Sequence, residues 1–152
     1  MTRASTAPNL PAAASARAWV GVVSRAHVQR GVAGGFAQLC HGKRGPLARM
    51  RPGDWLVYYS PSTEFGAGEP LRAFTALGRV TGADIYPFDM GGGFVPFRRD
   101  VAYERVHETP IRALAPRLAF VRDNPRWGML ARRGHFGIGP EDLEVIARAL
   151  RA

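Results

Sequence analysis

Short runs of β-branched and aromatic residues, separated by glycine and proline, constrain the fold of this chain more than any other feature. Five runs have the length and composition of strands: residues 19–23, 55–59, 72–80, 85–88 and 97–106. Ser60-Pro61 is expected to end the second strand, and Pro87 indicates that the fourth lies at a sheet edge. The chain is therefore predicted to be built mainly on a sheet.

Helical spacing is less common and falls in short segments: residues 25–32, 46–50, 111–118 and 140–150. Ser24 would cap the first helix through its side-chain oxygen, and Gly31, Gly34 and Gly35 would end it. Pro116 interrupts the third helix. Several short strands with few helices predict an α+β fold, either a small, partly open barrel or a curled sheet.

The chain is expected to form one domain, over residues 18–152 of its 152 residues. Residues 1–17 contain two prolines and no aromatic side chain, so we expect a disordered tail there. No apolar run approaches the roughly 18 residues of a membrane span, and the start lacks a signal peptide's apolar core, which favours a cytoplasmic protein. Cys40 is the only cysteine, which excludes an intrachain disulfide and a four-cysteine zinc site.

Positive charge is concentrated in the first third of the chain. The net charge is +9, from 21 Lys and Arg against 12 Asp and Glu. Residues 1–53 carry eight of these cations and no acid, whereas residues 54–152 carry thirteen cations and all twelve acids. A basic segment of this kind attracts phosphate backbones through counterion release, although a merely solvated surface has the same composition. The charge thus favours nucleic acid as the partner.

Groups suited to catalysis or metal binding are sparse. Cys40 and His41 suggest a nucleophile and its base, but adjacent residues on an extended segment point to opposite faces. The four histidines lack the spacing of metal ligands. The glycines at 34–35 and 91–93 lack the pattern and the lysine of a phosphate-binding loop. We therefore predict that the protein is not an enzyme and uses no metal or cofactor.

Aromatic residues offer a second sign of nucleic-acid binding. Tyr58 and Tyr59 must point to opposite faces of their strand, so at least one is expected to leave the core. Phe36 follows two glycines in a predicted loop. An exposed aromatic ring beside basic groups can stack on a base. Arg98 and Arg99 also split between two faces, so one can reach a phosphate while the other pairs with an acid.

The ordered motifs of this chain resemble those of the EVE domain, and in particular the single-domain bacterial EVE proteins. The resemblance covers residues 18 to about 147. Its motifs are WVGVVS (19–24), GGFAQLCHGK (34–43), PGDWLVYYSP (52–61), EPLRAFTA (69–76), FVPFRRD (94–100) and WG (127–128). EVE domains belong to the PUA-like superfamily, with the YTH and ASCH domains. The resemblance implies a PUA-like pseudo-barrel of five to six strands with short flanking helices.

The resemblance also implies a function, which is the reading of a modified base that leaves the stack and enters an aromatic pocket. The base would be 5-methylcytosine or 5-hydroxymethylcytosine in DNA, or a modified base in RNA. Mapped by chain order onto the related YTH domains, the pocket residues would be Ser24, Phe36, Gln38, Tyr59, Ser60 and Trp127. The candidates for phosphate contacts are Lys43, Arg44, Arg98 and Arg99.

Two readings of the function remain open at this stage. The first is a monomeric reader of a modified base, for which binding weakens steeply with salt. The alternative is a pocket for a small ligand, a nucleoside or a metabolite, with the basic surface incidental. Stabilisation by a free nucleoside without binding to any oligonucleotide would favour the alternative.

Overall fold

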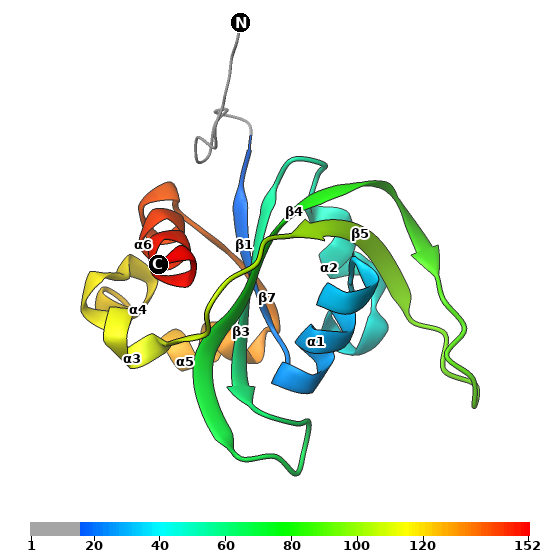
Figure 1. Ribbon diagram of the computed structural model, residues 1–152, viewed down its shortest axis with the longest axis horizontal. Helices are drawn as coiled ribbons and strands as arrows, with labels where there is room; N and C mark the ends of the chain where they lie inside the picture. The colour runs from blue at the N-terminus through cyan, green and yellow to red at the C-terminus, as the bar shows by residue number, and fades with distance from the viewer. Residues whose placement is uncertain (1–15) are drawn as a thin grey trace, which may run out of the picture.

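One mixed sheet, with helices on both sides, makes up the fold. The computed structural model describes residues 16–152 (Figure 1). Seven strands run in the order β2-β5-β4-β3-β1-β7, with β6 paired to β4. Their bounds are β1 (Ala18–Val22), β2 (Phe36–Ala37), β3 (Trp55–Ser62), β4 (Pro70–Pro87), β5 (Phe97–Tyr103), β6 (Thr109–Pro110) and β7 (His135–Ile138).

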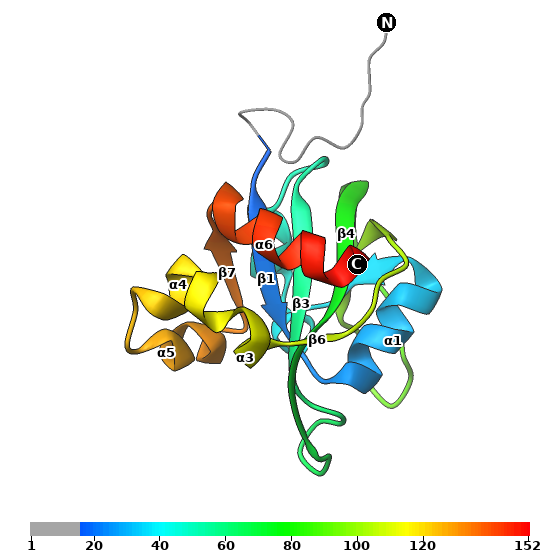
Figure 2. The ribbon, with the colours of Figure 1, turned by 60° about the vertical axis from the view of Figure 1, so that its left-hand side comes forward.

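The helices are short, apart from those that follow β1 and β7. They are α1 (Arg25–Gly34), α2 (Arg44–Arg49), α3 (Ile111–Leu114), α4 (Ala119–Arg122), α5 (Trp127–Arg132) and α6 (Pro140–Arg151). Two single 3-10 turns, η2 (Cys40–Gly42) and η3 (Ala115–Arg117), complete the set. Figure 2 shows α6 lying across β1 and β3, with α3, α4 and α5 beside it and α1 at the opposite side of the molecule.

A parallel pair of strands lies near the middle of the sheet. β1 runs parallel to β3, with Val20 opposite Val57. Parallel neighbours need a crossover connection, which the chain supplies through α1, β2 and α2. β7 and β4 extend the sheet on either side of this pair, both antiparallel to their neighbours. The pairing gathers the carboxyl ends of β1 and β3 at one end of the sheet.

Both faces of the sheet are buried. Trp55, Val57 and Tyr59 on β3 face a first core that includes α6. Leu56 and Tyr58 face a second core that includes residues of α1 and α2. Tyr58 and Tyr59 are only 1% and 6% exposed. The prediction that one of them leaves the core is wrong, because helices cover both sides of their strand.

The predicted α+β fold with short flanking helices is confirmed, with more strands than the five to six expected. β2 and β6 have two residues each, too few for a periodic pattern. The separate strands predicted at 72–80 and 85–88 are one long strand, β4, whose register shifts between Val80 and Ile85. β3 continues to Ser62 instead of ending at Ser60-Pro61, because register shifts accommodate the proline.

The predicted helix caps are mostly confirmed. The Ser24 side chain accepts a hydrogen bond from the His27 backbone N–H at 3.3 Å and begins α1. Gly35 ends this helix with a left-handed φ of 73°. Gly31 lies inside α1 instead of ending it, where a Cβ would come within 2.8 Å of the Phe36 carbonyl oxygen. Helix α6 begins at Pro140 as predicted.

The buried Asp54 carboxylate joins the start of the domain to the turn before β3. Residues 1–15 of the tail expected at 1–17 lie outside the described residues, but the Arg17 backbone N–H donates to Asp54 Oδ1 at 3.1 Å. Asp54 Oδ2 accepts from Trp19 Nε1 and from the Arg51 backbone N–H, both at 3.0 Å. The Asp54 carbonyl oxygen also accepts from the Val80 N–H at 2.9 Å. One residue thus links β1, β3 and β4.

Replacing Asp54 with Asn should lower the free energy of unfolding by about 1–3 kcal/mol, because the amide NH₂ would face at least one donor. Urea denaturation of the full chain measures the loss. The matched control is Asp84→Asn, since Asp84 is an exposed acid near the far end of β4. An equal, small effect of both substitutions would contradict the role given to Asp54.

His135 adds a buried group that titrates. Its ring is 1% exposed and stacks on Trp19 with ring centroids 4.8 Å apart. Neither ring nitrogen has a hydrogen-bond partner among residues 16–152. Burial, helped by the nearby Arg49 charge, lowers the pKa of His135 from 6.5 to about 4. The native protein therefore favours the neutral ring.

The free energy of unfolding should accordingly fall as the pH drops from 6.5 toward 4. In this range His135 binds a proton in the unfolded chain but stays neutral in the native protein. Each pKa unit is worth about 1.4 kcal/mol, so the total loss is about 3 kcal/mol. His135→Phe should keep the stack and flatten this slope in urea titrations at pH 7.5, 6, 5 and 4.5. The exposed His107→Gln variant should retain it, and an unchanged slope in His135→Phe would refute the assignment.

Candidate nucleic-acid interface

Arg98 of β5 forms the centre of the candidate site. Its Cζ atom lies 3.8 Å from the centroid of the Phe36 ring and 3.9 Å from that of the Phe88 ring. Phe36 belongs to β2, and Phe88 directly follows β4. The guanidinium thus lies against two aromatic rings, and Arg98 as a whole residue is only 8% exposed.

The alternation of side chains along β5 explains this position. Phe97 packs against the second core. Arg99 turns the same way, and its Nη1 donates to the carbonyls of Leu47 and Met50 at 2.9 and 2.8 Å. Its Nε donates to the Gly82 carbonyl at 2.8 Å. Arg99 therefore satisfies backbone carbonyls at the end of α2, while Arg98 points to the other face of the strand.

Gln38 anchors the Arg98 side chain. Arg98 Nε donates to Gln38 Oε1 at 3.0 Å. Arginine has no acceptor, so the amide oxygen must face it and Gln38 Nε2 must point elsewhere. The Gln38 carbonyl lies 2.7 Å from His27 Nε2, and because a carbonyl only accepts, this nitrogen carries the proton. Two residues that are far apart in sequence, His27 and Arg98, thus meet at Gln38.

The site carries positive charge without a nearby counter-ion. Arg98 forms no ion pair among residues 16–152. Burial lowers the pKa of the Arg98 guanidinium, Tyr86 opposes this shift, and Arg30 adds to it. Burial is also the main cause that lowers the pKa of His27. Tyr86 donates to Asp100 Oδ1 at 2.6 Å, so that carboxylate oxygen already has a partner.

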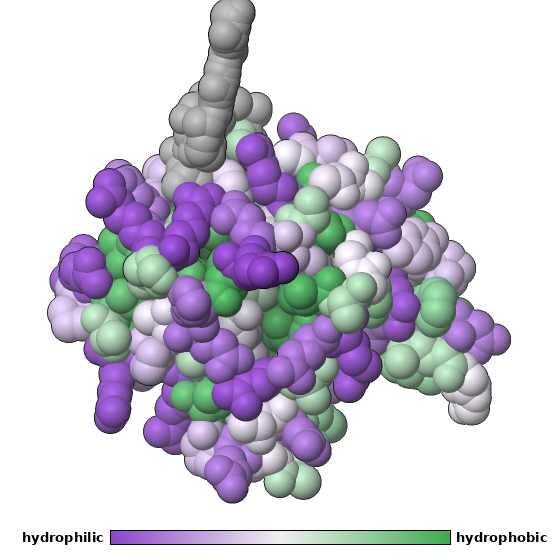
Figure 3. Space-filling view, in the orientation of Figure 1, coloured by the Kyte–Doolittle hydropathy of each residue, from purple (hydrophilic) through white to green (hydrophobic). Residues whose placement is uncertain are grey.

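Exposed apolar side chains lie next to the site, on the loop between β4 and β5. Phe88, Met90, Phe94 and Val95 are all exposed, around three glycines with left-handed φ. Figure 3 shows apolar residues gathered on the projecting end of this hairpin. Proteins place such surfaces where a partner covers them.

A strained turn borders the same loop. Cys40, His41 and Gly42 have consecutive left-handed φ values of 49°, 62° and 84°. A Cβ on Gly42 would overlap Pro96, so the turn packs directly on the loop between β4 and β5. The exposed His41 ring makes an edge contact with Phe65, with centroids 5.8 Å apart. Left-handed backbone at non-glycine residues is costly and is concentrated at functional sites.

The predicted phosphate-binding residues fall into two groups, because Arg98 and Arg99 are buried whereas Lys43 and Arg44 lie on the surface. Lys43 and Arg44 are exposed, as is Arg30, and none of the three forms an ion pair within residues 16–152. Arg25, another cation of the first third, donates to both oxygens of Glu108 at 2.9 and 2.8 Å. Within the acid-free segment, Glu108 from a later part of the chain therefore neutralises the charge of Arg25.

The predicted base-binding residues separate in the same way. Phe36 and Gln38 lie at Arg98. Tyr59 packs edge-on against Phe74 and Trp127, with centroids 5.8 and 5.6 Å away, in the first core. Ser60 is fully buried, and its Oγ lies 2.8 Å from Thr75 Oγ1. Ser24 caps α1, so the structure does not gather these residues around Arg98.

Sequence reasoning missed His27 and Phe88. His27 follows the predicted cap Ser24 by three residues, which places it in the first turn of the helix. Phe88 lies two residues after Tyr86 and directly follows β4, the strand that pairs Tyr86 with Arg98. Only the register of β4 against β5 would have brought Phe88 to Arg98, and only the packing of α1 on the segment after β2 would have brought His27 to Gln38.

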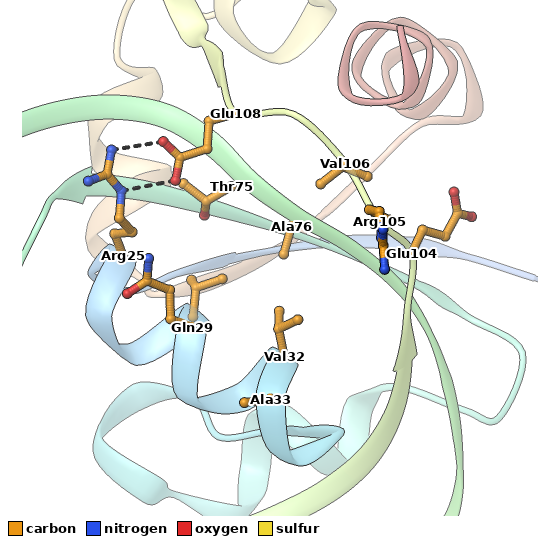
Figure 4. Close-up of a pocket in the computed structure, with 11 residues that line it drawn as sticks. Arg25, Gln29, Val32, Ala33, Thr75, Ala76, Glu104, Arg105, Val106 and Glu108 are labelled. Carbon is orange, nitrogen blue, oxygen red and sulfur yellow. Dashed lines mark hydrogen bonds and ion pairs between the residues drawn. The ribbon is translucent and has the colours of Figure 1, made fainter.

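A separate groove of about 340 Å³ lies between α1 and residues 104–108 (Figure 4). Its floor includes Thr75 and Ala76 of β4, and Val32 lines its wall. The ion pair between Arg25 and Glu108 spans one end. None of the ten predicted site residues lines this groove, so it is separate from the predicted site.

The described part of the chain contains neither a metal-binding cluster nor a membrane-spanning helix. Among residues 16–152, no three His, Cys, Asp or Glu side chains gather so that they could hold a metal ion. No helix within the same range has the length and apolar character needed to cross a membrane.

Comparison with known proteins identifies relatives along nearly the whole chain. The model of the EVE domain family matches residues 17–149. UPF0310 protein YdcG of Bacillus subtilis is 48% identical over 132 residues, which are 87% of this chain and 90% of that protein. A UPF0310 protein of Mycolicibacterium vanbaalenii is also 48% identical over 132 residues, 87% of this chain and 91% of its own.

A solved structure shares the fold. The NMR structure of a protein from Rhodopseudomonas palustris superposes with a TM-score of 0.50 at 18% sequence identity. The superposition covers 88% of this chain and 92% of that one.

The two adjacent arginines should differ sharply in their effect on stability. Arg99→Lys leaves buried carbonyls of Leu47 and Met50 without a planar fork, which should cost about 2–4 kcal/mol. Arg98→Lys keeps a cation near the two rings and should cost about 1 kcal/mol or less. Urea denaturation measures the free energy of unfolding of both variants. Equal losses of this free energy would show that both arginines stabilise the fold.

Proposed function

The chain belongs to the EVE domain family, and we propose that it reads a modified base of a nucleic acid at the site formed by Arg98, Gln38, Phe36 and Phe88. The base would be a modified cytosine in DNA or a modified base in RNA. The observation that carries the proposal is a guanidinium held between two aromatic rings without a carboxylate partner in the described residues. A structural arginine would normally be paired when it is this buried.

Stacking groups for a base that has left its strand are close at hand. One side of the Phe88 ring contacts Arg98, yet the side chain is still 45% exposed. Phe94 on the same loop is also exposed. Aromatic rings of this kind stack on bases with about 1–3 kcal/mol per base. The accessible part of the Gln38 amide supplies the polar contact that a base edge requires.

Unopposed cations beside the site would hold the phosphate backbone. We assign this role to Lys43, Arg44 and Arg30, which are exposed and form no ion pair in the described residues. Lys43 and Arg44 follow the strained η2 turn directly, and this turn packs against the loop that carries Phe94. Base contacts and phosphate contacts thus adjoin each other, as recognition of a single extruded base needs.

A panel of oligonucleotides tests the proposal. The same DNA and RNA strands, with one position plain or modified, are titrated into the full chain by fluorescence anisotropy at several salt concentrations. Lys43→Ala and Arg44→Ala should weaken binding to every strand alike and each lower the salt slope by about 1. Phe88→Ala should remove the preference for the modified strand, because it removes a stacking surface. Arg112→Ala, at an exposed arginine without an ion pair in residues 16–152, is the matched control.

Two outcomes would contradict the proposed recognition of a modified base. Binding that does not depend on the salt concentration would show that the basic surface does not contact the phosphate backbone. Equal effects of Phe88→Ala on plain and modified strands would remove the base site.

The groove beside α1 supports a second candidate function, the binding of a free nucleoside or metabolite. Its volume of about 340 Å³ suits a ligand of that size, and its floor is lined by small side chains. Val32→Trp should fill this groove and leave the Arg98 site intact. A nucleoside that raises the melting temperature of the parent protein but not of Val32→Trp would favour this function over polymer binding.

A further inference from the structure

The side-chain groups of Arg98 and Gln38 that lack a hydrogen-bond partner within residues 16–152 are all donors. Arg98 uses only Nε within the described residues, on Gln38 Oε1, so Nη1 and Nη2 have no partner there. Gln38 Nε2 has no partner in that range either. None of these three nitrogens is both enclosed and unsatisfied, so each reaches solvent.

Both acceptors of Gln38, and one oxygen of Asp100, already have partners. Gln38 Oε1 accepts from Arg98, and the Gln38 carbonyl accepts from His27 Nε2. Asp100 Oδ1 accepts from Tyr86, on the neighbouring strand. No Asp or Glu of residues 16–152 forms an ion pair with Arg98, so a ligand can bring acceptors to the free Nη atoms.

The fork is also held in place before any ligand binds. The contacts of Cζ with the Phe36 and Phe88 rings and the hydrogen bond to Gln38 restrict the movement of the guanidinium. Arg98 as a whole residue is more than nine-tenths buried. A planar fork held in this way loses little freedom when it binds two acceptor atoms at once.

We propose that the modified base read at this site carries a pair of acceptor oxygens, best a carboxylate, and that Arg98 binds this pair through Nη1 and Nη2. This inference rests on the function proposed above and narrows it to oxidised, acceptor-bearing substituents. A methyl group would leave the donors of the fork without partners in a partly desolvated site, which works against binding. A backbone phosphate has the same chemistry, so the experiment separates a phosphate from a base substituent.

The experiment uses one oligonucleotide with a single variable cytosine: plain, 5-methyl, 5-formyl or 5-carboxyl. The affinity should rise in that direction from methyl to carboxyl, with at least a tenfold difference between those two ends. Arg98→Lys should remove most of this difference, because an ammonium keeps the charge but loses the fork. Arg112→Lys is the matched control and should leave the series unchanged.

A second variant guards against a folding effect of the first. Gln38→Glu keeps the size of the side chain and places a carboxylate on Arg98 Nε, which neutralises the fork internally. It should also abolish the preference for carboxyl, at an unchanged melting temperature. A preserved preference in both variants would overturn the assignment of Arg98.

Neutral methylphosphonate linkages flanking the variable base separate the two sources of oxygen. If Arg98 reads the base, the difference between carboxyl and methyl persists with these linkages. If it instead holds a phosphate, Arg98→Lys weakens all charged strands equally and has no effect on the neutral ones, which overturns the inference. A preference for the methyl over the carboxyl strand would also overturn this inference, although recognition of a modified base would still hold. If the protein bound no oligonucleotide at all, the proposed function itself would be refuted.

Discussion

The fold depends on a buried carboxylate that holds strands of different origin together. Asp54 accepts hydrogen bonds from the backbone at Arg17 and Arg51 and from the Trp19 indole, and so fixes the start of β1 beside the start of β3. A parallel pair has no tight turn to set its register, so a side chain that bonds both strands can supply it. Asp54 is also the first acid in the chain, and it is buried.

The register of β1 against β3 also determines how the residues of the Arg98 site come together. With β1 and β3 aligned, the crossover brings β2 back beside β5, where Phe36 lies opposite Asp100 and Ala37 opposite Arg99. Alternation along β5 then divides two adjacent arginines between two tasks. Arg99 closes the end of α2 through the carbonyls of Leu47 and Met50 and also binds that of Gly82 in β4, whereas Arg98 faces the aromatic rings. A one-residue slip of β5 would exchange the two side chains and destroy both arrangements.

Patterns of neighbouring residues in the sequence predicted the elements that depend only on neighbouring residues. The long strands and the caps of α1 and α6 follow from side-chain alternation, from Ser24 and from Pro140. β2 could not be predicted, since two residues become a strand only through their pairing with β5. The same limit applies to the site. Phe36, Gln38 and Arg98 were identified from motifs, but Phe88 and His27 join them only through sheet register and the return of the helix. Mapping by chain order placed Tyr59 and Trp127 in a pocket, whereas in the structure Tyr59 belongs to the first core and the partly buried Trp127 of α5 packs against it.

The energetics of Arg98 explain why a functional reading of this site is preferable to a structural one. Moving a guanidinium out of water costs free energy that a carboxylate or a full set of acceptors normally offsets. Here two rings and one amide oxygen offset only part of it, and each cation–π contact adds about 0.5–2 kcal/mol. An aliphatic side chain between Phe36 and Phe88 would pack the same space without that cost. Local choices that oppose stability are concentrated where a protein meets its ligand, and at Arg98 the unused donors indicate which atoms that ligand must supply.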